Sequence, residues 1–254
     1  MTKIIMHGCN GKMGQIIVDL VKKDPTASIV AGVDINDSIS NDFPVFKSIT
    51  ECDVEADVVI DFAAVGCIPA LVNYCSEKKL PVVVCTTGLS EEQVEMVNKA
   101  SEQTAVLRSA NMSLGINTLF NVLENITGVL AEAGFDIEIV EKHHNQKIDA
   151  PSGTALALAD VINNTLNNNY KYKFDRSKER EKRTNNEIGI SAVRGGTIVG
   201  EHEIIFAGTD EVIEIKHTAY SKAIFAKGAI TAAKYLAGKP AGMYDMRQVT
   251  AECM

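Results

Sequence analysis

Two adjacent imidazoles and an ammonium group lie close together in the chain, at His143, His144 and Lys147. An imidazole exchanges protons near neutral pH, and a lysine carries a positive charge there. The segment therefore predicts an anion site with its own proton source. Two other interpretations stay open, a pair of surface histidines or a metal site. Neighbouring histidines on a loop point in different directions and no third ligand follows at a suitable spacing, which disfavours a metal.

A possible helix start follows directly after this segment. Ser152 can cap a helix over residues 153–166, whose first N–H groups, around Gly153 and Thr154, have no partner inside the helix. Such groups bind carboxylates, and the Thr154 hydroxyl can add a hydrogen bond. With Lys147 supplying charge, the sequence predicts that a small carboxylate substrate binds here.

A second chemical pattern is the glycine cluster near the N-terminus. Gly8, Gly11 and Gly14 stand between an apolar strand-like run and a helical pattern. In that context glycines allow a tight turn, and the N–H groups at the helix start bind the pyrophosphate of a dinucleotide. The spacing is G-x-x-G-x-x-G, so Asn10 occupies the place of the second glycine in the commoner fingerprint.

Asp34 closes the next strand, twenty residues after Gly14. A carboxylate there accepts hydrogen bonds from both ribose hydroxyls of an adenosine and repels the 2′-phosphate of NADP. Lys12, in the glycine loop, could reach that phosphate. The sequence therefore favours NADH without excluding NADPH.

Other polar segments follow predicted strands at the edge where ligands bind in parallel sheets. They are Asp61-Phe62, Thr86-Thr87-Gly88 after Cys85, and Ala110-Asn111 before Met112. Each alone is an ordinary loop. Together they indicate one crevice.

The elements that must position these residues change character along the chain. Apolar runs at residues 4–6, 29–33, 58–60, 82–84 and 105–107 alternate with helical patterns, including those at 68–75 and 91–100. Near-continuous Val and Ile runs of this length are typical of parallel strands buried on both faces. The fold class predicted is α/β, with a Rossmann-like doubly wound parallel sheet.

A second domain is predicted after residue 112. A helix from about residue 114 and an alternating strand at 135–140 lead to a polar loop that begins at Glu141. Residues 167–187 have the composition of a solvated loop, and strands follow at 188–193, 203–206 and 212–216. We expect an α+β domain with a mostly antiparallel or mixed sheet over residues 113–222. A C-terminal helix at 224–236, with Gly238 after its end, could pack on either domain.

Composition excludes several classes of protein. The 254 residues carry 25 Lys and Arg against 33 Asp and Glu, a net charge of −8, which argues against nucleic-acid binding. No apolar run approaches the roughly 20 residues needed to span a bilayer, so we expect a cytoplasmic protein. The six cysteines form no C-x-x-C pair, and none lies between Cys85 and Cys253. A semialdehyde dehydrogenase, which needs a thiol there, is therefore disfavoured.

The chain resembles the 4-hydroxy-tetrahydrodipicolinate reductase (dihydrodipicolinate reductase) family along its whole length. The resemblance rests on residues 8–14, Asp61-Phe62, Thr86-Thr87-Gly88, Asn111-x-Ser113-x-Gly115-x-Asn117, residues 143–154, Arg194-Gly195-Gly196-x-x-x-Gly200-Glu201-His202 and Phe225-Ala226-x-Gly228-Ala229. It implies reduction of 4-hydroxy-tetrahydrodipicolinate, a small dicarboxylate, with NADH or NADPH in lysine and diaminopimelate biosynthesis. It also implies a homotetramer and a dinucleotide domain of residues 1–112, completed by 223–254. A dinucleotide-sensing regulator, or another two-domain NAD(P)-dependent dehydrogenase, is the alternative.

Residue roles follow from the same resemblance. His143 is similar to the family's proton donor and acceptor, and Lys147 to its second proton donor. The expected substrate ligands are His144, Ser152, Gly153 and Thr154. The expected cofactor ligands are Gly8, Cys9, Asn10, Gly11, Lys12, Met13, Asp34, Phe62, Cys85, Thr86, Thr87, Ala110, Asn111 and Met112. Two residues depart from the family pattern: Cys85 replaces a glycine, and Lys222 replaces an arginine whose planar fork a lysine lacks.

Overall fold

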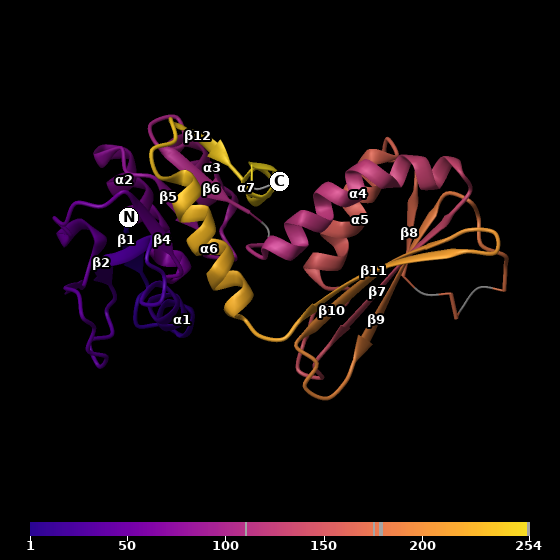
Figure 1. Cartoon of the computed structure of the whole chain (residues 1–254), viewed down its shortest axis with the longest axis horizontal. Helices are drawn as coiled ribbons and strands as arrows, with labels where there is room; N and C mark the ends of the chain where they lie inside the picture. The colour runs from indigo at the N-terminus through magenta and orange to yellow at the C-terminus, as the bar shows by residue number, and fades with distance from the viewer. Residues whose placement is uncertain (110, 175, 178–179, 253–254) are drawn as a thin grey trace. The chain divides into compact units, whose positions relative to one another are not determined.

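The computed structural model describes residues 1–109, 111–174, 176–177 and 180–252. The chain forms two compact units: Met1–Leu114 with the segment from Lys222 onward, and Gly115–Ser221. We call them the first and the second unit (Figure 1).

The first unit is built on a parallel seven-stranded sheet. The strand order is β12-β6-β5-β4-β1-β2-β3. The strands are β1 (Thr2–His7), β2 (Ala27–Val33), β3 (Val45–Phe46), β4 (Val58–Asp61), β5 (Val82–Val84), β6 (Ala105–Arg108) and β12 (Gly242–Tyr244). The order reverses at β1, so the predicted doubly wound sheet is confirmed, and its switch point lies between β1 and β4.

Helices cover both faces of this sheet because its strands present apolar side chains alternately to each side. Ile4 and Met6 of β1 pack into one core with α1 and α6, whereas Ile5 packs into the other with α2 and α3. The helices are α1 (Lys12–Val21), α2 (Ile68–Lys78), α3 (Glu91–Ala100), α6 (Ala223–Leu236) and α7 (Met246–Glu252), with short 3₁₀ turns at Ile49–Glu51 and Val65–Cys67. The C-terminal helix α6, which the helical pattern left unassigned and the family resemblance placed with the dinucleotide domain, belongs to this unit.

The second unit is a mixed five-stranded sheet with two helices. The strand order is β11-β10-β7-β9-β8; β9 is parallel to β7 and β8, and β10 is antiparallel to β7 and β11. The elements are α4 (Leu114–Glu132), β7 (Asp136–His143), α5 (Gly153–Thr165), β8 (Lys171–Lys173), β9 (Glu187–Arg194), β10 (Gly200–Ala207) and β11 (Val212–Ala219). Alternate residues of β7, such as Ile137 and Ile139, form one core with α4 and α5.

Two predictions for the second unit were wrong in detail. Residues 167–187 are not all loop, because Lys171–Lys173 forms the edge strand β8. The strand predicted to stop before Glu141 continues to His143, paired with β9 up to Arg194. His143 is therefore the last residue of a strand, which places its side chain on the same face as Ile137 and Ile139.

Candidate functional site

The glycine turn of the first unit joins β1 to α1 in a conformation that requires glycine. Gly8 has φ of +83°, and a Cβ there would lie 2.7 Å from the Phe62 carbonyl oxygen. A Cβ at Gly14 would lie 2.1 Å from the Gly8 carbonyl oxygen. Gly11 is the N-cap of α1 and offers no capping side chain. The turn therefore brings bare backbone to the carboxyl edge of the sheet.

Asp34 and Asn10 connect this turn to the loop after β2. The Asp34 carboxylate accepts hydrogen bonds from the backbone N–H groups of Asn10 and Asn36, both at 2.9 Å. The Asn10 side chain donates to the Asn36 carbonyl and accepts from Asn41 Nδ2 at 2.8 Å. Asn10 therefore fastens the two loops together, which a glycine at this position could not do.

A cavity of about 280 Å³ lies beside the turn. Four predicted cofactor ligands line it: Gly8, Gly11, Asp34 and Phe62. Two further lining residues, His7 and Lys47, were not predicted. Lys47 is exposed, with its ammonium 3.7 Å from the Asp37 carboxylate. It is a cation beside Asp34, where a 2′-phosphate would approach, and its distance in sequence from the glycine loop hides it from motif analysis.

The remaining predicted cofactor residues differ in how far their side chains are buried. Cys9 and Met112 are buried in the core, so their backbone atoms are the ones left to face a ligand, whereas Met13 is half-buried and packs against that core. Burial also raises the pKa of the Cys9 thiol to about 11. Lys12 and Thr87 are exposed, and Asn111 accepts a hydrogen bond from the Ser113 N–H at 2.8 Å. Ala110 lies outside the described residues.

Buried polar groups hold together the ends of three neighbouring strands. Asp61, at the end of β4, is paired with His7 Nδ1 at 2.8 Å and accepts from the Thr86 hydroxyl at 2.6 Å. Cys85 donates its backbone N–H to the Asp61 carbonyl. The predicted residues Cys85 and Thr86 are thus brought to the same edge as the glycine turn, and Asp61 is the residue that links them to His7.

The second unit contains a buried cluster around His143. Its Nδ1 lies 2.6 Å from Glu141 Oε2, and Glu141 is fully buried. Burial alone would raise the pKa of Glu141, but hydrogen bonds from Arg194, His143 and the Ser152 N–H outweigh it and lower that pKa. An ionised carboxylate only accepts, so the Nδ1 of His143 carries the hydrogen. The other ring nitrogen, Nε2, is left for proton exchange.

Arg194 and Ser152 complete the surroundings of the Glu141 carboxylate. Arg194 donates to both oxygens, at 2.7 Å each, and to the Asp149 carbonyl. Ser152 donates its backbone N–H to Glu141 Oε1 at 3.0 Å. Glu141, Arg194 and His202 are functional candidates that the sequence analysis left without roles. The signal for Glu141 was present, since it falls on the buried face of an alternating strand.

Ser152 is the N-cap of α5, as predicted. Its hydroxyl accepts from the Ala155 N–H at 3.1 Å and lies 2.8 Å from His202 Nε2. Burial, with a smaller effect of His143, lowers the pKa of His202 to about 4, so its ring is neutral near pH 7. The Ser152 hydroxyl and His202 Nε2 therefore share one hydrogen bond between neutral groups. The rings of His143 and His202 meet edge to face, with centroids 5.1 Å apart.

The other predicted substrate residues lie on the loop and helix start that follow β7. The Lys147 ammonium is paired with Asp149 at 2.7 Å, which lowers the pKa of that carboxyl. Gly153 is exposed at the first position of α5, and His144 and Thr154 are half-buried. His143 and Ser152 are therefore joined through Glu141, and Lys147 reaches Asp149 on the segment that leads to Ser152.

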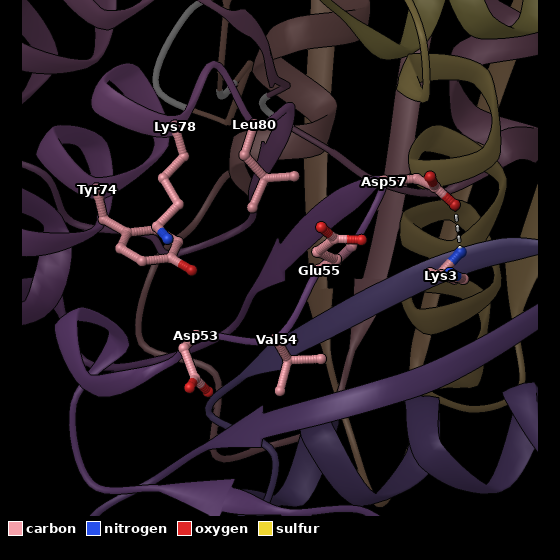
Figure 2. Close-up of a pocket in the computed structure, with 9 residues that line it drawn as sticks. Lys3, Asp53, Val54, Glu55, Asp57, Tyr74, Lys78 and Leu80 are labelled. Carbon is pink, nitrogen blue, oxygen red and sulfur yellow. Dashed lines mark hydrogen bonds between the residues drawn. The ribbon is translucent and has the colours of Figure 1, made fainter.

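A different cavity, of about 290 Å³, opens at the opposite edge of the first unit's sheet (Figure 2). Lys3, Asp57 and Leu80 line it and lie near the amino ends of β1, β4 and β5. Ligands of parallel α/β sheets bind at the carboxyl ends instead. This cavity therefore contributes no candidate site.

Two further features concern metals and membranes. Among the described residues, no group of three or more His, Cys, Asp or Glu side chains is arranged to hold a metal ion. In the same part of the chain, no helix has the length and apolar character needed to span a membrane.

The doubly wound sheet, its glycine turn and the acidic residue after β2 define a protein of the dinucleotide-binding class. Residues 2–112 match the family model described as "Dihydrodipicolinate reductase, N-terminus", and residues 115–250 match "Dihydrodipicolinate reductase, C-terminus". The chain belongs to the dihydrodipicolinate reductase family.

Individual relatives agree with this assignment. A 4-hydroxy-tetrahydrodipicolinate reductase of Caldanaerobacter subterraneus subsp. tengcongensis is 53% identical over 249 residues, which cover 98% of each chain. That of Clostridium tetani is 51% identical, covering 97% of this chain and 96% of the relative. A dipicolinate-bound dihydrodipicolinate reductase from Paenisporosarcina sp. TG-14 has the same fold, with a TM-score of 0.78, 24% identity and coverage of 96% and 97%.

Proposed function

We propose that this chain reduces 4-hydroxy-tetrahydrodipicolinate to tetrahydrodipicolinate with NADH or NADPH, as a step of lysine and diaminopimelate biosynthesis. The reaction consumes one hydride and one proton and releases one water. The observation that carries the proposal is the buried Glu141–His143 pair, hydrogen-bonded to the turn that starts α5. It supplies a proton donor and an anion-binding helix start in one unit.

The first unit is proposed to bind the dinucleotide. Its residues fit the group, because a Cβ at Gly8 or Gly14 would collide with backbone and close the turn. Gly8 and Gly11 would face the pyrophosphate and Asp34 the adenosine ribose. When bound, NADH or NADPH supplies the hydride. Thr86, held by Asp61, would border the nicotinamide end, with Cys85, Thr87, Asn111 and the backbone at Met112 close by.

The second unit is proposed to bind and protonate the substrate. His143 would donate its proton from Nε2 to the electron-rich atom left by hydride addition, while Glu141 stabilises the imidazolium. Gly153 and Thr154 would bind one substrate carboxylate through backbone N–H groups and a hydroxyl, with His144 and Ser152 beside them. Lys147 would supply positive charge and a second proton.

Assembly as a homotetramer is proposed through the second unit. The face of its sheet opposite α4 and α5 carries half-buried apolar residues, Val140 and Ile205, between charged residues such as Lys142 and Glu203. Mixed apolar and paired charged surfaces suit contact between copies of one chain. Sedimentation equilibrium of the purified protein tests this, and a monomer at micromolar concentration would overturn it.

Cofactor choice is proposed to favour NADH at least as much as NADPH, because Asp34 accepts ribose hydroxyls. Lys47, exposed beside Asp34, would be the main compensation for a 2′-phosphate. The test is kcat/KM for both dinucleotides in the wild type and in Asp34→Ala, which should lower the NADH value more. A tenfold preference of the wild type for NADPH would contradict the proposal.

The activity itself is tested by oxidation of NADH or NADPH with 4-hydroxy-tetrahydrodipicolinate generated enzymatically in the same cuvette. We expect loss of reduced nicotinamide absorbance that depends on both the protein and the substrate. The matched control is the His143→Gln protein. Absence of turnover with both dinucleotides would overturn the proposed function.

A further inference from the structure

The Glu141 carboxylate uses all of its acceptor capacity. Oε2 accepts from His143 Nδ1 at 2.6 Å and Arg194 Nη1 at 2.7 Å, while Oε1 accepts from Arg194 Nη2 at 2.7 Å and the Ser152 N–H at 3.0 Å. A carboxylate has about four lone-pair positions, and each meets a donor here. The side chain is fully buried. A charge placed in the interior with four donors is held in one orientation.

These donors come from three separate segments of the second unit. His143 follows Glu141 on β7, Arg194 ends β9, and Ser152 starts α5. Glu141 therefore connects the proton donor to the helix start that is proposed to bind the substrate carboxylate. A displacement of either one by about 1 Å would misalign proton and substrate, at a large cost in rate.

His202 holds the same helix start at the Ser152 hydroxyl. The Ser152 hydroxyl accepts from the Ala155 N–H at 3.1 Å and is hydrogen-bonded to His202 Nε2 at 2.8 Å. Ser152 is thus fixed at its backbone by Glu141 and at its hydroxyl by His202. The titratable and charged groups around His143 are Glu141 on its own strand, Arg194 from β9 and His202 from β10.

We infer that Glu141 is a positioning residue, which fixes the Nδ1–H tautomer of His143 and aligns that proton donor with the anion-binding turn at Ser152. The inference rests on the proposed function for its kinetic consequences. The tautomer and the alignment are properties of the chain alone, so they can be tested without turnover.

Glu141→Gln is the decisive variant because it keeps the shape of the side chain. In the glutamine side chain an NH₂ group replaces one of the two carboxylate oxygens. An NH₂ group cannot accept hydrogen bonds, so the two bonds to the replaced oxygen are lost in either orientation of the amide. Loss of the negative charge also disfavours the imidazolium form of His143. We expect kcat to fall about 100-fold, the cost of misplacing a catalytic group by about 1 Å. The alkaline limb of the pH–rate profile should move to lower pH, and dinucleotide affinity should change less than about twofold.

Glu187→Gln is the matched control. Glu187 is also buried and paired with an arginine, Arg176, but it lies at the other end of β9 and contacts no histidine. We expect an unchanged kcat and pH profile. A Glu141→Gln protein with the kcat and profile of the wild type would overturn the inference. So would an equal loss in both variants, because it would show a general effect of removing a buried charge.

Nitrogen-15 spectra of histidine-labelled protein separate this inference from the proposed function. In the neutral wild type we expect the hydrogen of His143 on Nδ1, assigned by its absence from the His143→Gln spectrum. A hydrogen on Nε2 would overturn the inference even if the enzyme is active. An Nδ1–H signal in a protein that turns over no substrate would leave the tautomer assignment standing while the proposed function fails.

Arg194→Lys serves if the Glu141 variant does not fold. A lysine keeps the charge but loses the two-pronged contact with Glu141. We expect kcat/KM to fall about tenfold, the equivalent of one lost hydrogen bond to a charged group, with the His143 Nδ1–H signal retained. An unchanged kcat/KM would show that the orientation of Glu141 has no part in the reaction.

Discussion

Two regions differ in the kind of protein atom that they offer to a ligand: the glycine turn at the carboxyl edge of the first unit's sheet, and the cluster around His143 in the second unit. At the glycine edge the backbone is proposed to do the binding: the side chains of Cys9 and Met112 are buried in the core, and glycines bring bare peptide groups to the cavity. In the cluster, side chains are proposed to carry out the chemistry: Glu141, His143 and Arg194 meet through their functional groups. The function proposed for the first region therefore depends on the absence of side chains at its glycines, and that of the second on the functional groups of particular residues.

The largest expected effect tests whether the His143 cluster depends on the functional group of a particular residue. His143→Gln keeps size and hydrogen bonding but cannot act as an acid, so kcat should fall about 100- to 10,000-fold. Dinucleotide affinity, measured by fluorescence titration, should stay within about twofold. If His143→Gln retained kcat while His144→Gln lost it, the proton donor would be the second imidazole.

The Gly14→Ala variant tests whether the glycine turn depends on the absence of a side chain. The added methyl group would lie 2.1 Å from the Gly8 carbonyl oxygen, so the turn must move. We expect a loss of about 1–3 kcal/mol in the free energy of unfolding, together with strongly weakened dinucleotide binding. Gly66→Ala is the control, since a Cβ there meets no atom within 4 Å. Equal stability of the two variants, measured by urea unfolding, would contradict the argument.

A pH-dependent effect is expected at His202. Its folded pKa of about 4 lies below the ordinary value of 6.5, so the unfolded chain binds the extra proton between those pH values. The stabilisation is complete above about pH 6.5 and is lost as the pH falls toward 4. At pH 5 the loss amounts to about 2 kcal/mol. His202→Gln removes the titrating group. The difference in free energy of unfolding between this variant and the wild type should therefore become smaller as the pH is lowered from 7.5 to 5. A constant gap in melting scans would refute this account.

The smallest expected effect separates binding from chemistry within the cluster. Thr154→Ala removes a hydroxyl proposed to bind the substrate carboxylate in the ground state and the transition state alike. We expect KM to rise about five- to tenfold with kcat nearly unchanged. Thr165→Ala, near the far end of α5, is the control. A fall in kcat with an unchanged KM would place Thr154 in the chemical step instead.

Local patterns were enough to predict most of the fold. Apolar runs and glycines located five of the seven strands of the first unit and its ligand edge, and Ser152 marked the start of α5. Strand β8 was missed because Lys171–Lys173 has no apolar run and pairs only at the edge of its sheet. Strand β3 has two residues, Val45–Phe46, too few to form a periodic pattern.

The candidate site was predicted in part. Sequence proximity revealed His143, Lys147 and Ser152, which lie on one continuous segment. It could not reveal Arg194 or His202, which reach the same cluster from 53 and 50 positions away along the chain, measured from Glu141 and Ser152 respectively. Those meetings depend on the pairing of β7 with β9 and β10, a tertiary feature that no local pattern encodes.

The return of the chain to the first unit has a consequence for synthesis on the ribosome. Helix α6 packs against α1 and supplies the buried residues Ala226, Ala229 and Ala233 to the core of the first sheet. The ribosome releases residues 1–114 first, yet this part of their core appears only after the whole of Gly115–Ser221. All residues of the second unit are therefore synthesised before helix α6, which the first unit needs to complete its core. Until α6 has been made, the apolar face of the sheet that α6 covers in the folded unit lacks that cover.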